Sequence, residues 1–147
     1  MKRTKLIQWG ALAIVGGFIL IQLVPYGRDH TNPPIQSEPN WDSPETRALA
    51  KTACFDCHSN ETNWGLWYES VAPSSWLVQH DVEEGRQYLN FSEWDQNGQP
   101  REIDELWRVV ENGSMPPGQY LILHAEAKLT AEQANLLAAG LRATTGN

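Results

Sequence analysis

The sequence of 147 residues contains very little sulfur. It has only two cysteines, Cys54 and Cys57, and both lie in the seven-residue stretch CFDCHSN. Met115 is the only methionine after the initiator. Two cysteines cannot build a disulfide framework, and they cannot by themselves supply the four ligands of a structural zinc site. These few sulfur-containing side chains are therefore the first candidates for a functional site.

Basic residues are also scarce beyond the start of the chain. Lys2, Arg3 and Lys5 account for three of the 11 Lys and Arg, whereas all 18 Asp and Glu follow residue 25. A nucleic-acid partner is not expected, because phosphate binding needs clustered basic side chains. The chain also lacks a nucleophile elbow, a phosphate-binding loop and a metal-hydrolase motif, so we do not expect an enzyme.

A long apolar run lies near the N-terminus. The 19 residues from Leu6 to Val24 carry no charge, and as a helix they are just long enough to cross a hydrocarbon core of about 30 Å. The basic residues before the run predict that the N-terminus stays in the cytoplasm. A cleaved signal peptide is the alternative, but the run exceeds the usual apolar region of about 7–15 residues. No small-residue cleavage site follows it, so we expect an uncleaved single-pass anchor.

Three segments follow from this pattern. Residues 1–25 form the cytoplasmic end and the membrane anchor. Residues 26–41 contain Pro33, Pro34 and Pro39, which cannot sustain a helix, so an extended tether is predicted. Residues 42–147 form a single exported domain.

The exported domain carries helical signals and no convincing strand alternation. Ser43 followed by Pro44 is typical of a helix N-terminus, and Thr130 with Gln133 forms a capping box. Helices are expected from Ser43 to about Phe55, from about Ser74 through His80, from about Glu102 to Asn112, and from Thr130 to Leu141. The fold class predicted is a small all-α domain.

Four interpretations of CFDCHSN compete. A thioredoxin-like redox pair belongs to a βαβ context, which is absent here. A zinc site needs further ligands from scattered histidines that lack the usual spacing. A structural disulfide between Cys54 and Cys57 closes too small a loop to stabilise much. Cys-x-x-Cys-His is also the attachment signature of c-type haem, and covalent haem is the interpretation we favour.

The spacing of that signature has a mechanical reason. Cysteines three residues apart on a helical turn project toward the two vinyl groups on one edge of the porphyrin. The adjacent histidine, His58, then turns its ring under the iron as the proximal ligand. Thioether bonds consume both thiols, which agrees with the presence of only Cys54 and Cys57 in an exported chain.

The sixth ligand of such an iron has two candidates. Met115 lies in the loop GSMPPG, where the following prolines stiffen the backbone, and its thioether is a soft ligand that raises the reduction potential. His80 is the rival, because it follows Trp76 by one helical turn. His124 and His30 have weaker claims. The sequence favours Met115 without eliminating His80.

With these residues placed, the chain resembles class I c-type cytochromes. In those proteins an N-terminal helix ends in the attachment motif, a Met-Pro loop supplies the distal sulfur, and a C-terminal helix packs across the first. More closely, the stretches VPYGRDHTNPP, ACFDCHSNETNW, VAPSSWLVQHDVEEGR and MPPGQY are similar to the bacterial "haem-binding domain" family of membrane-anchored cytochrome c-like proteins. That resemblance implies one covalent haem c on the outer side of the bacterial cytoplasmic membrane.

The function expected is single-electron transfer by a membrane-tethered monohaem c-type cytochrome. Cys54 and Cys57 are the predicted covalent anchors, His58 the proximal ligand, and Met115 or His80 the distal ligand. Redox proteins, not identified by the sequence, are the expected partners. The alternatives are a haem-based gas or redox sensor or a peroxidase-type module with a labile distal position, and a structural zinc module.

Overall fold

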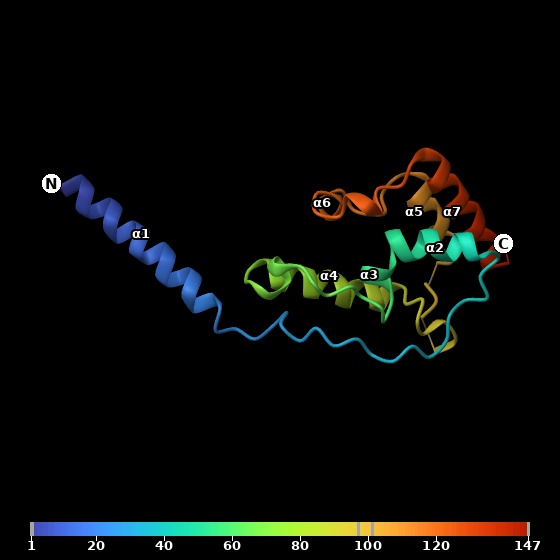
Figure 1. Ribbon diagram of the computed structural model, residues 1–147, viewed down its shortest axis with the longest axis horizontal. Coiled ribbons are helices and arrows are strands. Elements are labelled where there is room, and N and C mark those ends of the chain that lie inside the picture. The colour runs from blue at the N-terminus through green and yellow to red at the C-terminus, as the bar shows by residue number, and fades with distance from the viewer. Residues whose placement is uncertain (1, 97, 101, 147) are drawn as a thin grey trace. The chain divides into compact units, whose positions relative to one another are not determined.

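The computed structural model describes residues 2–96, 98–100 and 102–146, and within these ranges the chain is helical without a β-strand. Its α-helices are α1 (Lys2–Ile21), α2 (Pro44–Ala53), α3 (Phe55–His58), α4 (Ser74–Tyr88), α5 (Glu105–Glu111), α6 (Gly118–Leu121) and α7 (Ala131–Thr144). Short 3-10 helices are η1 (Trp67–Ser70), η2 (Trp94–Gln96) and η3 (Ala125–Ala127). The predicted all-α fold class is confirmed (Figure 1).

The chain is divided into two compact units. Unit 1 consists of the residues up to Thr31 together with Trp64–Asp81, and unit 2 consists of Asn32–Asn63 together with the residues from Val82 onward. Helix α4 passes from unit 1 into unit 2. Residues 26–41, predicted to be extended, contain no helix and contribute to both units.

Unit 1 begins with α1, whose residues Arg3–Ile21 are long and apolar enough to cross a membrane. Directly after α1, the side-chain amide of Gln22 makes two hydrogen bonds with the backbone of Ala72. Its Nε2 donates to the carbonyl oxygen at 2.9 Å, and its Oε1 accepts from the N–H at 3.0 Å. Gly27 has a φ of +73°, and a Cβ there would lie 2.2 Å from the carbonyl oxygen of Ser75. The segment that follows α1 therefore packs closely on the residues that begin α4.

Unit 2 is built around an aromatic core. The rings of Phe55 and Phe91 stack with centroids 5.5 Å apart, and the Trp94 ring also stacks on Phe91, with centroids 6.0 Å apart. Aliphatic side chains from α5 and α7 complete the buried cluster. Its buried members are Ala50, Phe55, Leu89, Phe91, Trp94, Leu106, Trp107, Val110, Leu137, Ala138 and Leu141. This core fixes the helix that leads into the cysteine motif.

Helix α7 packs against both α2 and α5 in unit 2 (Figure 1). The crossing of α2 and α7 is especially close, because a Cβ at Gly140 would lie 2.0 Å from the hydroxyl oxygen of Thr46. Thr46 is buried at this crossing and hydrogen-bonds to the Ser43 side chain at 2.9 Å. Glycine at position 140 therefore allows the C-terminal helix to lie directly on the helix that precedes the motif.

Both predicted helix caps are confirmed. The Ser43 hydroxyl accepts a hydrogen bond from the N–H of Thr46, and the Thr130 hydroxyl accepts one from the N–H of Gln133. The capping box at Thr130 is complete, since the Gln133 side chain also accepts from the Thr130 N–H at 2.9 Å. These contacts depend only on neighbours in sequence, which is why the sequence predicts them well.

Two predicted boundaries are shifted. The first helix ends at Ala53 instead of about Phe55, because Cys54 at φ −127° and ψ −32° leaves the helical region and starts a new turn. Helix α5 begins at Glu105 instead of Glu102. The residues before it form a tighter turn, in which the N–H of Glu105 bonds to the carbonyl of Glu102 at 3.0 Å.

Candidate functional site

The two cysteines and the histidine of the motif occupy one tight helical turn in unit 2. Cys54 ends α2 and precedes α3, and its carbonyl oxygen accepts from the N–H groups of Cys57 at 3.2 Å and His58 at 2.9 Å. Side chains three residues apart on such a turn lie on the same side of the helix. Neither cysteine forms a disulfide. The structure thus presents two thiols and an imidazole from a single turn, and it does not form the alternative disulfide.

The His58 ring is held by backbone carbonyls of unit 2. Its Nδ1 lies 2.9 Å from the carbonyl oxygen of Gly85 and 3.2 Å from that of Leu89. A carbonyl oxygen can only accept, so Nδ1 carries the proton and donates it, and Nε2 is the basic nitrogen. Burial lowers the pKa of His58, although these two hydrogen bonds oppose the shift. The ring is therefore neutral at neutral pH, in the tautomer that offers Nε2 to a metal.

Gly85 brings α4 into direct contact with the motif. A Cβ at this position would lie 2.4 Å from the carbonyl oxygen of Cys57 and 3.0 Å from its Cβ. Real side chains essentially never approach so closely, so only glycine allows this packing. The same close approach places the Gly85 carbonyl within hydrogen-bonding distance of the His58 ring.

The Cys54 thiol is not prepared to act as a thiolate. Burial, with a smaller contribution from the neighbouring Cys57, raises the pKa of Cys54 to about 12. Reactive redox cysteines and zinc ligands instead need a lowered pKa or a metal that deprotonates them. In the part of the chain that the structure describes, no group of three or more His, Cys, Asp or Glu is arranged to hold a metal ion. The zinc and redox-pair interpretations therefore gain no support from this site.

The same residues fit the covalent attachment of a haem. Neither cysteine is in a disulfide, so each thiol can form one C–S bond, and the thioether that results carries no charge in its half-buried position. The imidazole beside them has a fixed orientation and a basic Nε2. The turn therefore suits haem attachment better than zinc binding.

Met115 lies on a separate loop of unit 2, after α5. Gly113, at φ +72°, ends that helix as predicted. The loop is then fixed by two bonds: the Ser114 N–H donates to the Asn112 side chain, and the Met115 N–H donates to the carbonyl of Val109, both at 2.9 Å. The Met115 side chain is 37% exposed. The backbone at the candidate distal ligand is thus held in place while its sulfur-bearing side chain reaches the surface of the protein chain.

The remaining histidines have other surroundings. His80 is exposed on the part of α4 that belongs to unit 1, whereas Met115 belongs to unit 2. The His30 ring stacks on Trp64 at 4.6 Å, also in unit 1. The His124 ring stacks on Tyr120 at 4.0 Å, next to α6. His124 thus belongs to the same unit as the motif turn, and His30 and His80 belong to unit 1.

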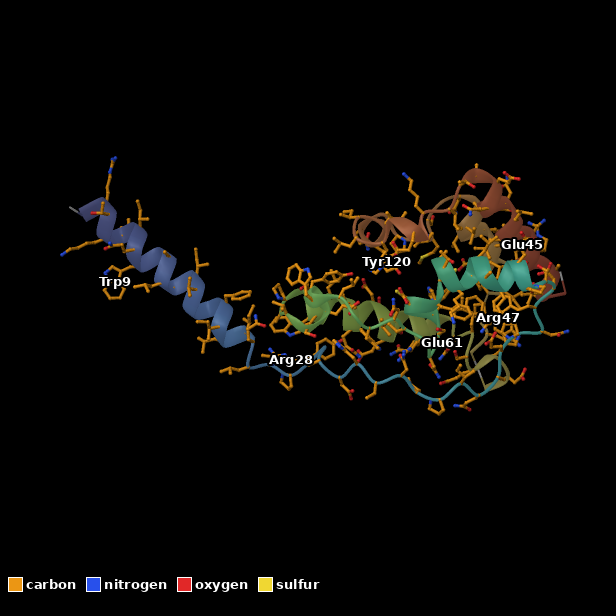
Figure 2. The ribbon with its side chains drawn as sticks, in the orientation of Figure 1. Trp9, Arg28, Glu45, Arg47, Glu61 and Tyr120 are labelled. Carbon is orange, nitrogen blue, oxygen red and sulfur yellow. The ribbon has the colours of Figure 1, made fainter. Side chains whose placement is uncertain are left out.

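One contact near the motif is not predicted from the sequence. The hydroxyl of Tyr120, on α6, donates to Asp56 Oδ2 at 2.6 Å (Figure 2 labels Tyr120). Asp56 is one of the two residues between the cysteines, so this bond ties the Met115 loop to the motif. Burial, and then the carboxylate partner, raises the pKa of Tyr120, which keeps the hydroxyl protonated. The only signal in the sequence is a tyrosine directly after MPPGQ.

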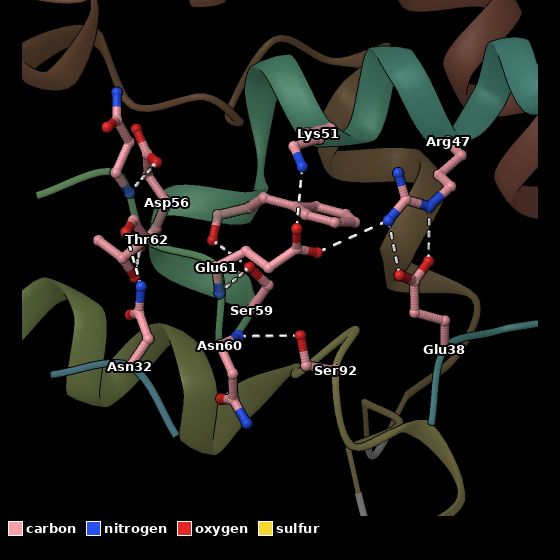
Figure 3. Close-up of polar contacts among 12 residues, drawn as sticks. Asn32, Glu38, Arg47, Lys51, Asp56, Ser59, Asn60, Glu61, Thr62 and Ser92 are labelled. Atoms are coloured by element: carbon pink, nitrogen blue, oxygen red, sulfur yellow. Dashed lines mark hydrogen bonds and ion pairs between the residues drawn. The ribbon is translucent and has the colours of Figure 1, made fainter. Parts of the chain in front are cut away.

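The chain that leaves the motif is also fixed by polar contacts (Figure 3). The Ser59 hydroxyl donates to the carbonyl of Phe55 at 2.8 Å, and the N–H of Asn60 donates to the Ser92 hydroxyl at 2.9 Å. The Thr62 hydroxyl donates to the carbonyl of Asp56 at 2.7 Å. These buried or half-buried bonds fix the backbone on both sides of His58.

A group of charged side chains covers one side of α2 (Figure 3). Arg47 binds Glu38 through two hydrogen bonds of 2.6 and 2.7 Å, and Lys51 binds Glu61 at 2.9 Å. The Arg47 hydrogen bonds lower the pKa of Glu38 against the opposing effect of burial. The pair fastens the extended segment before α2 to that helix.

A turn that presents two thiols and an oriented imidazole, inside an all-helical domain, fits a haem-binding module. The chain belongs to the haem-binding domain family, whose model matches residues 16–143. Comparisons with curated proteins and with solved structures gave no match. The family match supports the resemblance seen in the sequence and extends it into the second half of α1.

Proposed function

We propose that this haem-binding protein is a membrane-tethered monohaem c-type cytochrome that transfers single electrons outside the cytoplasmic membrane. The observation that carries the proposal is the His58 ring, whose Nδ1 donates to the carbonyls of Gly85 and Leu89, on the same turn as two cysteines that form no disulfide. This arrangement suits a permanently attached group whose proximal iron ligand comes from the same turn as its attachment points.

Each residue of the turn has a role in this proposal. Cys54 and Cys57 would form thioethers with the two vinyl groups, and His58 Nε2 would be the proximal ligand. Haem c would supply a one-electron couple between ferric and ferrous iron. The backbone carbonyls of α4 hold the imidazole orientation, and their hydrogen bonds make the ring a stronger donor. Phe55, between the two cysteines, is buried in the core and anchors the turn there.

Met115 is the proposed distal ligand, and His80 is the alternative. Met115 is favoured because its backbone is fixed by the bond to Val109 and its loop is tied to the motif through Tyr120. A thioether sulfur stabilises ferrous iron and so raises the potential. A ligand held by a fixed loop suits an electron carrier, since little has to move when the electron arrives.

The setting of the protein is part of the same proposal. Helix α1 is the uncleaved anchor, with Lys2, Arg3 and Lys5 on the cytoplasmic side, so the residues that follow the anchor lie on the outer face of the bacterial inner membrane. The partners are redox proteins that exchange electrons with the haem. No catalytic residues are assigned.

Spectroscopy of the full chain with its haem tests the function. A carrier should take up one electron reversibly, show the sulfur-to-iron charge-transfer band when oxidised, and bind carbon monoxide poorly when reduced. Met115→Ala should abolish the band, lower the potential and open the iron to carbon monoxide. His80→Ala is the matched variant and should leave all three properties unchanged.

Other outcomes select the competing functions. Ready binding of carbon monoxide by the unaltered protein would favour the sensor or peroxidase-type module with a labile distal position. If His80→Ala opens the iron and Met115→Ala does not, the distal ligand is His80, and electron transfer remains the function. Bound zinc in place of haem would replace the whole proposal.

A further inference from the structure

An uncharged aromatic tip projects from unit 1. The stretch WGLWY, residues 64–68, contains three aromatic residues and no charge. Trp67 is 78% exposed and Leu66 is 39% exposed. Exposed tryptophan of this degree is unusual in a chain that buries Trp94 and Trp107 in its core. We define residues 64–68 as the aromatic tip.

The backbone of the tip is fixed by hydrogen bonds to the buried side chain of Glu69, which directly follows it. Glu69 is only 4% exposed, and its Oε2 accepts from the N–H groups of Gly65 and Leu66, both at 2.8 Å. The His30 ring stacks on Trp64 from the other side. The charge is therefore turned inward and the apolar side chains of Leu66 and Trp67 are turned outward, in a fixed conformation.

The tip is connected to the end of the apolar helix by a contact between residues far apart in the chain. Gln22, the first residue after α1, binds both backbone groups of Ala72, and the Arg28 guanidinium donates to the Gln22 carbonyl (Figure 2 labels Arg28 directly after α1). A span of 19 residues matches a hydrocarbon core of about 30 Å. Gln22 therefore reaches the headgroup layer, and Ala72 is bound to it there.

The distance from Ala72 back to the tip is short. Trp67 and Ala72 are five residues apart, and much of that stretch is the compact helix η1. Even fully extended, five residues cover at most about 18 Å. The tip thus lies within reach of the bilayer surface from which α1 emerges.

We propose that Leu66 and Trp67 insert into the interfacial layer of the lipid bilayer at the outer end of α1. Tryptophan prefers this layer because its ring is apolar while its N–H can bond to headgroups and water. The occupant of this surface is lipid, not a protein partner. This inference rests on the anchoring by α1 in the proposed function. This second contact with the bilayer would restrict the tilt of unit 1 relative to the membrane, which a single spanning helix does not restrict.

Fluorine NMR of the full haem-loaded chain tests the proposal. The protein is labelled with 5-fluorotryptophan and reconstituted in nanodiscs of phosphatidylethanolamine and phosphatidylglycerol. Trp67→Phe assigns the Trp67 signal, and the exposed position makes a folding defect unexpected. A spin label on the lipid acyl chain near the headgroup should broaden that signal severalfold, whereas a water-soluble gadolinium chelate should broaden it little.

Two further tryptophans calibrate the measurement. Trp9, on α1 (Figure 2), is the bilayer reference, and Trp94, buried in the core, should respond to neither agent. If Trp9 responds to the lipid label while Trp67 responds only to gadolinium, the anchor is correct and the inference is wrong. A Trp67 signal insensitive to both agents would show that protein covers the tip, which also overturns it. If Trp9 does not respond either, the anchoring itself fails, and the inference fails with it.

Discussion

The Tyr120 hydroxyl donates to Asp56 Oδ2 across 64 positions of sequence, at 2.6 Å. This single bond joins the loop that carries Met115 to the turn that carries the two cysteines. Asp56 is itself fixed, because its other carboxylate oxygen accepts from the Asn63 N–H at 3.0 Å. The distal loop and the motif are therefore not independent elements of unit 2.

Removing that hydroxyl should loosen the Met115 loop. A hydrogen bond to a charged acceptor contributes about 2 kcal/mol, so Tyr120→Phe should lower the free energy of unfolding by about that amount. The sulfur-to-iron charge-transfer band should also weaken, because the loop no longer holds its sulfur in one place. Denaturant unfolding and the oxidised absorption spectrum measure the two effects.

Tyr88→Phe is the matched control. The Tyr88 hydroxyl also donates to a carboxylate, that of Glu105, but this pair involves α4 and α5 and not the Met115 loop. It should leave the charge-transfer band unchanged. Equal weakening of the band in both variants would mean that Tyr120 does not position the distal loop specifically.

A methyl group at position 85 should disturb the backbone that holds the His58 ring. Gly85→Ala places a Cβ 2.4 Å from the Cys57 carbonyl oxygen, so α4 must move away and the carbonyls that hold His58 must move with it. Overpacking of this kind costs about 1–3 kcal/mol. Unfolding experiments should show that loss, and the yield of attached haem should fall.

Gly65→Ala provides the comparison, because a Cβ there meets nothing within 4 Å. It should leave both stability and haem content close to those of the unaltered protein. Normal haem yield and stability in Gly85→Ala would show that α4 does not pack on the motif as described.

The Glu38–Arg47 pair should make stability depend on pH. The hydrogen bonds from Arg47 hold the pKa of Glu38 below its ordinary value of 4.5. Folding therefore favours the ionised carboxylate, whose contribution is present above pH 4.5 and is lost as the pH falls through the lower folded pKa. Glu38→Gln should cost about 1 kcal/mol at neutral pH and progressively less on acidification.

The more exposed pair of Arg142 with Glu111, at 3.4 Å, is the control. Glu111→Gln should cost less than Glu38→Gln at neutral pH, because solvent screens this pair on both sides. Denaturant titrations at several pH values compare the two variants. A Glu38→Gln penalty that grows on acidification would contradict the assigned direction of the pKa shift.

Features that depend on nearby residues could be predicted from the sequence. The caps at Ser43 and Thr130 and the helix end at Gly113 each involve contacts within a few positions, and the structure confirms them. The helix predicted from Thr130 to Leu141 is also present, and it buries Leu137 and Leu141. Local rules of this kind decide where helices begin, end and bury a face.

Features that depend on distant residues could not be predicted. The sequence does not show that Gly85 must pack on Cys57, or that Tyr120 reaches Asp56, since each pair meets only through the tertiary fold. The grouping of Trp64–Asp81 with the residues around α1 has the same origin. The sequence shows the spacing of the two cysteines and His58, but it does not show which carbonyls select the His58 tautomer.

The central claim is that Cys54 and Cys57 carry a covalent haem beside His58. Intact mass spectrometry of the full chain under denaturing conditions tests it most directly, after expression with a c-type maturation system. The account predicts one species with the mass of the chain plus one haem, and loss of full two-bond attachment in Cys57→Ser. A bare chain from which all haem separates on denaturation, or undiminished attachment in the Cys54→Ser, Cys57→Ser double variant, would contradict it.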